Sequence, residues 1–173
     1  LPNSNPYQAS KTKEFDLIHT KLEVSFDWGN KYLNGKATIS LKPHAYVQDS
    51  LVLDAKGFEI KSIKRDQKDL EFSYDSLKLY IAFSELVNPS QKITLEIVYV
   101  ARPDELQAIK SGYSAIKDDK GLYFINPDGL DRDKPKQIWT QGETEASSCW
   151  FPTIDAPNQK MTQELYITTD TNY

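Results

Sequence analysis

The chain has 173 residues, of which 39% are hydrophobic and 27% are charged, proportions typical of a folded globular domain. Its 21 basic and 25 acidic residues give a net charge of −4 and are mixed along the sequence, so no basic stripe indicates a nucleic-acid partner. No apolar run approaches the roughly 18 residues of a membrane span.

The length predicts a single core. We expect residues 1–12 to be a flexible lead-in and residues 13–173 to form one domain. The opening, rich in Pro and Asn, would suit a mature chain after removal of an export signal, which implies a periplasmic or cell-envelope protein; a cytoplasmic location stays open. Cys149 is the single cysteine, so an internal disulfide is excluded and a small buried side chain is expected.

Alternation of apolar and polar residues predicts strands in the first part of the chain. Residues 21–28 alternate cleanly, and Gly29-Asn30 marks a turn. Residues 33–41 repeat the pattern up to Pro43, and short strands follow at 51–53 and 58–63. These segments each predict a strand with one buried face.

The following segments continue the β pattern. Residues 70–74 and 77–83 predict a hairpin across Asp75-Ser76, and residues 93–99 form a further alternating strand. No βαβ rhythm is present. The fold class is therefore all-β, an antiparallel β-sandwich or twisted open double sheet with few short helical turns. The side chains expected between the sheets are Leu22, Val24, Phe26, Ile39, Leu53, Leu79, Ile81, Leu95 and Ile97.

The regular pattern stops at Arg102. Residues 103–106 could form one helical turn, and the rest of the stretch to Lys120 indicates a long surface loop. Residues 122–125 predict a buried strand, and alternation returns at residues 163–169.

Between these last two strands lies the stretch that dominates the interpretation, from Gln137 to Lys160. A short apolar run brings Thr-Gln-Gly-Glu to what we predict is a strand end. Small residues and the apolar cluster Cys-Trp-Phe-Pro follow, and the stretch closes on Asp-Ala-Pro-Asn, a turn signal.

This stretch resembles the signature Thr-Gln-x-Glu followed by Phe-Pro-x-x-Asp-x-Pro of the aminopeptidase N family of zinc exopeptidases, the gluzincin aminopeptidases that include the leukotriene hydrolase branch. The similarity extends more weakly back to about Asp16, but it covers only the first domain of that family. The positions in register with the signature are Thr140, Gln141, Glu143, Phe151, Pro152, Asp155 and Pro157.

The resemblance implies a saddle-like N-terminal domain that helps a zinc aminopeptidase to recognise its substrate. In the family, this loop enters the cleft of the catalytic domain of the same polypeptide. By position, Glu143 would accept the α-ammonium of a peptide substrate and Gln141 would line the wall of the pocket for the first side chain. Gly142 between them would permit a close backbone approach or unusual dihedral angles. The implied partners are the amino end of the peptide and the catalytic domain.

The residues that would perform hydrolysis are not recognisable in the chain. A zinc peptidase typically uses two His one helical turn apart with a Glu between them. The two histidines, His19 and His44, stand on or beside different predicted strands, and neither is followed by Glu. The family motif Gly-x-Met-Glu-Asn is absent, since Met161 is followed by Thr162. We therefore assign no catalytic and no metal-binding residue, and expect zinc only in the catalytic domain of a longer parent enzyme.

Several alternatives stay open on the residues alone. Glu143 could be a solvated loop carboxylate, and the chain could be a free-standing β-sandwich module that holds peptide or glycan with exposed tyrosines. Glu145 is expected to be exposed, and turn capping would account for Asp155. Many family members carry Arg where Ser148 stands, so the group that braces the loop is open, with packing of Trp150 as one candidate.

Overall fold

The computed structural model describes residues 12–106 and 120–169. This part of the chain consists of strands and two short 3-10 helices. The elements are β1 (Phe15–Asp27), β2 (Tyr32–Pro43), β3 (Gln48–Asp54), β4 (Phe58–Arg65), β5 (Lys68–Asp69), β6 (Phe72–Tyr74), β7 (Lys78–Val87), β8 (Ile93–Ala101), η1 (Pro103–Glu105), β9 (Leu122–Ile125), β10 (Gln137–Thr140), η2 (Ser147–Cys149) and β11 (Thr162–Thr168).

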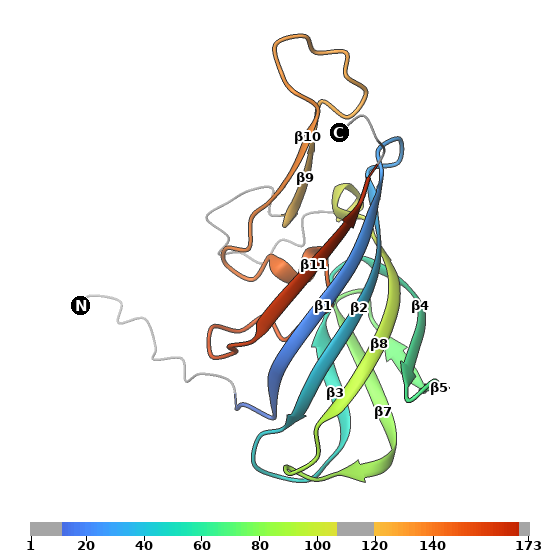
Figure 1. The fold of residues 1–173 in the computed structure, drawn as a ribbon, viewed down its shortest axis with the longest axis vertical. Coiled ribbons are helices and arrows are strands. Elements are labelled where there is room, and N and C mark those ends of the chain that lie inside the picture. Colours follow the sequence, from blue (N-terminus) through green and yellow to red (C-terminus); the bar gives the residue numbers. More distant parts are fainter. Residues whose placement is uncertain (1–11, 107–119, 170–173) are drawn as a thin grey trace, which may run out of the picture.

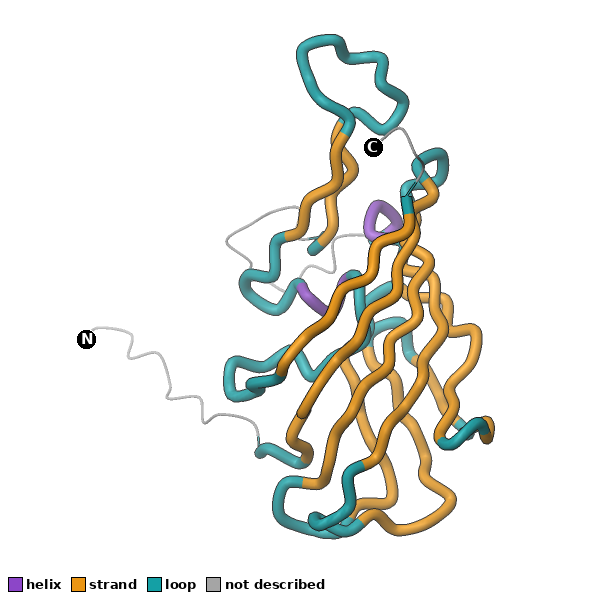
Figure 2. The backbone as a smooth tube through the Cα atoms, in the orientation of Figure 1, coloured by secondary structure: helices purple, strands orange, loops and turns teal. Residues whose placement is uncertain are grey.

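The strands form two packed sheets and a separate hairpin (Figure 1). The larger sheet has six strands in the order β11-β1-β2-β8-β4-β5, and it faces a three-stranded sheet with the order β3-β7-β6. The third sheet is the hairpin of β9 and β10, which extends away from the sandwich (Figure 2). The predicted all-β sandwich is confirmed. One pair departs from the antiparallel pattern, since β11 runs parallel to β1.

The core lies where alternation placed it. In β2 every second residue from Leu33 to Leu41 is buried, and β8 shows the same period. Of the nine side chains expected between the sheets, all are buried except Phe26, which is half-buried. Phe26 instead meets Phe124 of β9, with ring centroids 6.1 Å apart, so this end of β1 supports the hairpin. The predicted hairpin across Asp75-Ser76 is confirmed by the pairing of β6 with β7.

Tyr99 on β8 joins the core to the signature stretch. Its ring stacks on Phe58 at 4.9 Å and lies directly over Gly35 of β2. A Cβ at Gly35 would fall 2.4 Å from Tyr99 Cζ, so only glycine leaves room for the ring. The Tyr99 hydroxyl donates a hydrogen bond of 3.0 Å to the carbonyl oxygen of Trp150. Burial raises the pKa of Tyr99, so the hydroxyl stays a donor.

Two sequence expectations near the hairpin have different outcomes. The helical turn expected at residues 103–106 is present as η1, while most of the long loop after it lies outside the described residues. The prediction of a strand at residues 122–125 is confirmed as β9, but the prediction that it is buried is wrong. β9 pairs with β10 alone, and only Leu122 is fully buried. An apolar tetrapeptide does not reveal that its strand belongs to a two-stranded ribbon.

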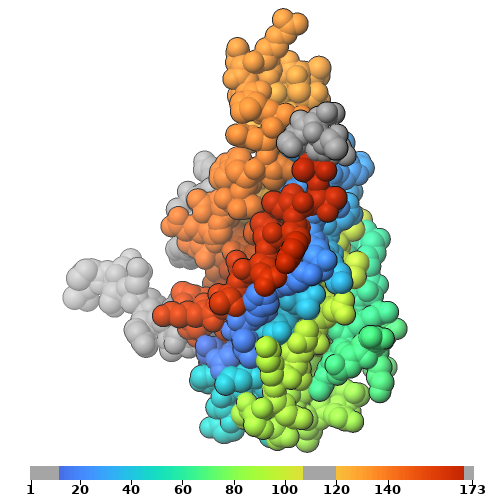
Figure 3. All heavy atoms as spheres, in the orientation of Figure 1, coloured from blue at the N-terminus to red at the C-terminus, as the bar shows by residue number. Residues whose placement is uncertain are grey.

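The edge strand β11 lies open on the surface (Figure 3). Its register places Leu165 beside Leu22 and Ile167 beside Val24. Every residue of β11 is nonetheless exposed, because the smaller sheet does not reach this edge. Across residues 12–106 and 120–169, no helix has the length and apolar character needed to cross a membrane.

The apolar cluster after η2 makes a first stability prediction. Phe151 is only 3% exposed and belongs to the main core. Phe151→Ala should lower the free energy of unfolding by about 3–5 kcal/mol, because it removes a buried ring and leaves a cavity. Phe72→Ala is the matched control, since Phe72 is 41% exposed. Denaturant melts that show similar losses for both variants would contradict the prediction.

Candidate functional site

The β9–β10 hairpin carries the candidate loop. Trp139 pairs with Tyr123 and Ile138 pairs with Phe124, so one face of the ribbon bears Phe124 and Ile138 and the other bears Tyr123 and Trp139. The first face packs on the sandwich, where Phe124 also meets Trp28 at 5.7 Å. This packing fixes the direction in which the chain leaves β10.

Gln141 follows directly after β10 and is half-buried. Its backbone N–H donates to the carbonyl oxygen of Gly121 at 3.0 Å, which continues the ladder one step beyond the pair of Thr140 and Leu122. Its side-chain Oε1 accepts a hydrogen bond from the N–H of Glu143 at 3.2 Å. One bond to Oε1 fixes the orientation of the amide, and the Nε2 group supplies two donors that Gln141 can offer a ligand.

Glu143 is exposed at the tip of this turn. Among the described residues, none forms a hydrogen bond or an ion pair with its carboxylate. Carboxylate oxygens accept charge-assisted hydrogen bonds from an ammonium group. The loop therefore presents one acceptor with a full charge and, beside it, one amide donor group.

Gly142 contributes space but no unusual backbone geometry. Its φ is not among the positive values in the chain, so the expectation of special dihedral angles is wrong. A Cβ at this position would lie 3.0 Å from Ser147 Oγ, which is a tight contact. The close backbone approach expected at Gly142 in the substrate site stays a prediction.

Lys56, at the turn between β3 and β4, braces the loop at residues 145–148. Its Nζ donates to the carbonyl oxygen of Glu145 at 2.5 Å, and its backbone N–H donates to that of Ser148 at 2.8 Å. The buried Ser148 adds a bond of 3.1 Å from Oγ to the carbonyl oxygen of Glu145. The Glu145 side chain is exposed, as expected. Lys56 and Ser148 thus hold the loop, although many family members carry Arg at the position of Ser148.

Asp155 ties the same loop to the sandwich. Its Oδ2 accepts from the N–H of Ser148 at 2.9 Å, and its own N–H donates to Asp54 Oδ2 at 3.0 Å. Asp54 also holds Lys78 Nζ at 2.6 Å, and this hydrogen bond raises the pKa of Lys78. The contribution of the pair to stability is therefore complete at neutral pH and is lost as pH rises through the pKa of Lys78. Asp155 does more than cap its own turn.

Trp150 has a smaller part in the bracing than the sequence suggested. It is half-buried and meets Phe151 edge to face at 4.6 Å, while its carbonyl oxygen accepts the bond from Tyr99. Cys149 is 2% exposed, as expected for a small apolar side chain. The bracing comes mainly from hydrogen bonds between polar side chains and the loop backbone, which the sequence does not display.

The histidines lie apart from the loop and from each other. His44 pairs with Asp16 at 3.0 Å, and His19 Nδ1 lies 2.7 Å from Thr162 Oγ1. Within the two described ranges, no group of three or more His, Cys, Asp or Glu side chains could hold a metal ion. The described residues thus do not fit a zinc site.

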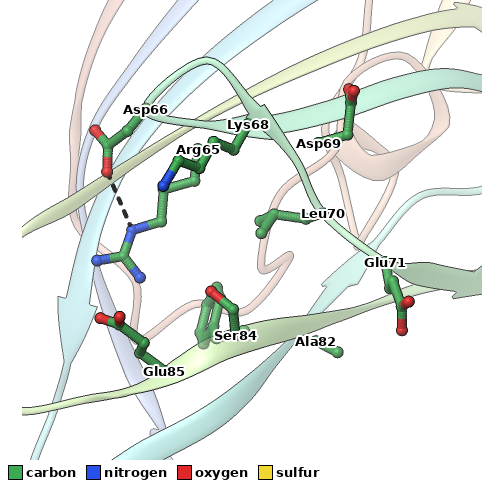
Figure 4. Close-up of a pocket in the computed structure, with 10 residues that line it drawn as sticks. Arg65, Asp66, Lys68, Asp69, Leu70, Glu71, Ala82, Ser84 and Glu85 are labelled. Carbon is green, nitrogen blue, oxygen red and sulfur yellow. Dashed lines mark ion pairs between the residues drawn. The ribbon is translucent and has the colours of Figure 1, made fainter.

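A separate cleft of about 620 Å³ opens between the β4–β5 hairpin and β7 (Figure 4). Arg65 and Asp66 form an ion pair at its rim, and Leu70 and Glu85 also line it. None of its lining residues belongs to β10 or to the loop after it. It marks the place where the chain crosses from one sheet to the other.

The sandwich, its hairpin and the braced loop match a known domain class. Residues 11–173 match the family model of the Peptidase M1 N-terminal domain, and the chain belongs to that family.

Individual relatives are similar in the same way. The chain is 23% identical to leucine aminopeptidase 2 of Vanderwaltozyma polyspora over 159 residues, which cover 92% of this chain and 23% of the relative. An M1 zinc metallopeptidase of Deinococcus radiodurans, in a mutant form bound to a Tyr-Ser-Ala substrate, has a TM-score of 0.73 at 15% identity, with 93% of this chain and 34% of that chain covered. Native leukotriene A4 hydrolase of Saccharomyces cerevisiae has a TM-score of 0.69 at 22% identity, with 96% and 26% covered. The chain therefore spans about a quarter to a third of the length of these relatives.

Two glycines give a matched test of how the loop is anchored. Gly121 and Gly129 both have positive φ, at 67° and 73°, so an alanine is strained at either position. A Cβ at Gly121 would lie 2.0 Å from the carbonyl oxygen of Ala146, whereas nothing lies within 4 Å at Gly129. Gly129→Ala should cost about 1 kcal/mol. Gly121→Ala should cost at least about 2 kcal/mol more, because the loop must move away from β9. Equal melting curves for the two variants would contradict this anchoring.

Proposed function

We propose that this domain supplies the substrate-recognition loop of a zinc aminopeptidase, and that it does not itself hydrolyse peptides. The observation that carries the proposal is the exposed carboxylate of Glu143, with no partner among the described residues, on a loop whose two ends are fixed by buried groups. Glu143 would bind the free α-ammonium of the peptide, and this contact would place the bond after the first residue at the site of cleavage.

The neighbouring groups suit the same ligand. The Oε1 of Gln141 is bound to the N–H of Glu143, and its Nε2 group would donate to a peptide carbonyl oxygen, a matching acceptor. Gly142 keeps the turn close to Ser147, which leaves the carboxylate at the tip. The relatives support this reading: one is a leucine aminopeptidase, and another is a zinc metallopeptidase bound to a Tyr-Ser-Ala peptide.

The remaining machinery would lie in the rest of a longer polypeptide. We assign residues 13–173 to one domain and zinc to a catalytic domain of the same polypeptide, because the described residues bring no metal ligands together. Bound zinc would polarise the scissile carbonyl and activate a water molecule. The part of this chain is to hold the amino end of the peptide, which fixes which bond meets the metal.

Glu143→Ala in the full-length enzyme tests the proposal. Truncation would leave the substrate ammonium without its partner, a loss of about 2–5 kcal/mol. At about 1.4 kcal/mol per tenfold change, kcat/KM should fall roughly thirty-fold to several thousand-fold. Glu143→Gln should lose less, because its amide oxygen still accepts a hydrogen bond.

Two controls separate recognition from shape. N-acetylated substrates cannot make the contact, so their slow hydrolysis should not change further in the variants. Glu145→Ala removes an exposed carboxylate two residues away and keeps the backbone oxygen that Lys56 binds, so it should change kcat/KM by no more than about twofold. Equal losses on free and acetylated substrates would mean that Glu143 only shapes the loop.

Metal removal gives an independent prediction. A chelator should abolish hydrolysis of aminoacyl reporter substrates by the full-length enzyme, and added zinc should restore it. The melting temperature of the 173-residue chain should not change with the chelator, because its described residues hold no metal cluster. A chelator-dependent shift of that temperature, measured by circular dichroism, would show that the chain itself binds metal.

A further inference from the structure

The outward face of the β9–β10 hairpin carries two stacked aromatic rings. The rings of Tyr123 and Trp139 lie 4.4 Å apart and nearly parallel, at 10°. Trp139 is 45% exposed, because the opposite face of the ribbon is the one that packs on the core. The exposed aromatic surface beside the candidate loop is therefore mainly that of Trp139, supported by the ring of Tyr123.

This surface is aligned with the recognition groups. The ladder continues to Gln141, so strand alternation puts Gln141 on the same face as Trp139. The residue across from Gln141 is Gly121, where the carbonyl oxygen of Ala146 takes the place of a side chain, so the loop closes this end of the face. Gln141 and the aromatic pair thus lie on one face of the ribbon, and Glu143 follows two residues after Gln141.

The spacing along this line matches that of an extended peptide. Every second residue of a strand faces the same side, at a repeat of about 6.8 Å. Gln141 and Trp139 are separated by one such repeat, and so are the first and third side chains of an extended ligand. If the first side chain lies at Gln141, the third reaches the aromatic pair.

We propose that Tyr123 and Trp139 form an apolar shelf for the third side chain of the peptide substrate, and that they favour peptides with an aromatic or large aliphatic residue at that position. This specificity role rests on the proposed function, since it takes the amino end of the peptide to be held at Glu143. A flat ring gains from stacking on such a shelf, whereas glycine gains nothing and a carboxylate loses hydration.

The test compares two peptides in the full-length enzyme, Ala-Ala-Phe and Ala-Ala-Gly. Trp139→Ala should lower kcat/KM for Ala-Ala-Phe by about three- to tenfold, as expected for the loss of an aromatic contact. It should leave kcat/KM for Ala-Ala-Gly within about twofold, so the preference between the peptides shrinks. Trp139→Phe should keep most of the preference, which a merely structural role would not predict. Phe72→Ala, which removes an aromatic ring of similar exposure on the smaller sheet, should leave the preference unchanged.

The other outcomes are distinct. Equal losses on both peptides would overturn the shelf and indicate that Trp139 packs against the catalytic domain or shapes the loop. No loss on either peptide would also overturn it. If Glu143→Ala has no effect on Ala-Ala-Gly, the proposed function fails, whatever Trp139 does.

A binding measurement covers the case of an inactive enzyme. The 173-residue chain is titrated with each peptide at millimolar concentration while the indole N–H signal of Trp139 is followed by NMR. A shift with Ala-Ala-Phe that is absent with Ala-Ala-Gly supports the shelf. The same response to both peptides, or none to either, overturns it.

Discussion

Complete burial of Tyr99 is the constraint on which the arrangement of the candidate loop depends. The ring fills the space that Gly35 leaves on the larger sheet and stacks on Phe58, while its hydroxyl reaches the carbonyl oxygen of Trp150. An unpaired hydroxyl at this depth would cost about 1–3 kcal/mol. The core and the segment after the loop must therefore stay in contact for the Tyr99 hydroxyl to keep its hydrogen bond to Trp150.

A second set of contacts anchors both ends of the loop without burying its tip. Lys56 and Asp155 hold the backbone of residues 145–148, and the hydrogen bond from Gln141 to Gly121 holds the other end. Glu143 stays exposed between these fixed points. A ligand that meets such a loop loses little free energy in ordering it, which is the benefit of preorganisation.

How far the sequence predicts this arrangement depends on the range of each interaction. Alternation within single strands is local, so the inner faces of β2 and β8 were predictable residue by residue. The signature spacing also singles out Gln141 and Glu143, and their role in binding substrate stays a prediction. The bond from Lys56 to Glu145 joins residues 89 positions apart and leaves no periodic trace. The parallel pairing of β11 with β1, and the partial exposure of β9, depend on which strands become neighbours, which no short pattern encodes.

The division between buried and exposed groups also separates the two roles of this segment. Phe151 and Ser148 lie in the interior and contribute to folding, whereas Glu143 and Trp139 are exposed and make little contribution to the core. An exposed carboxylate with no partner among the described residues adds little to the stability of the fold, and the exposed 45% of Trp139 adds nothing beyond its stacking on Tyr123. Exposure of Glu143 and Trp139 is consistent with contacts to a ligand or partner outside the domain. The β9–β10 ribbon is the element that makes this possible, because one of its faces is anchored on the core while Trp139 on the other is 45% exposed.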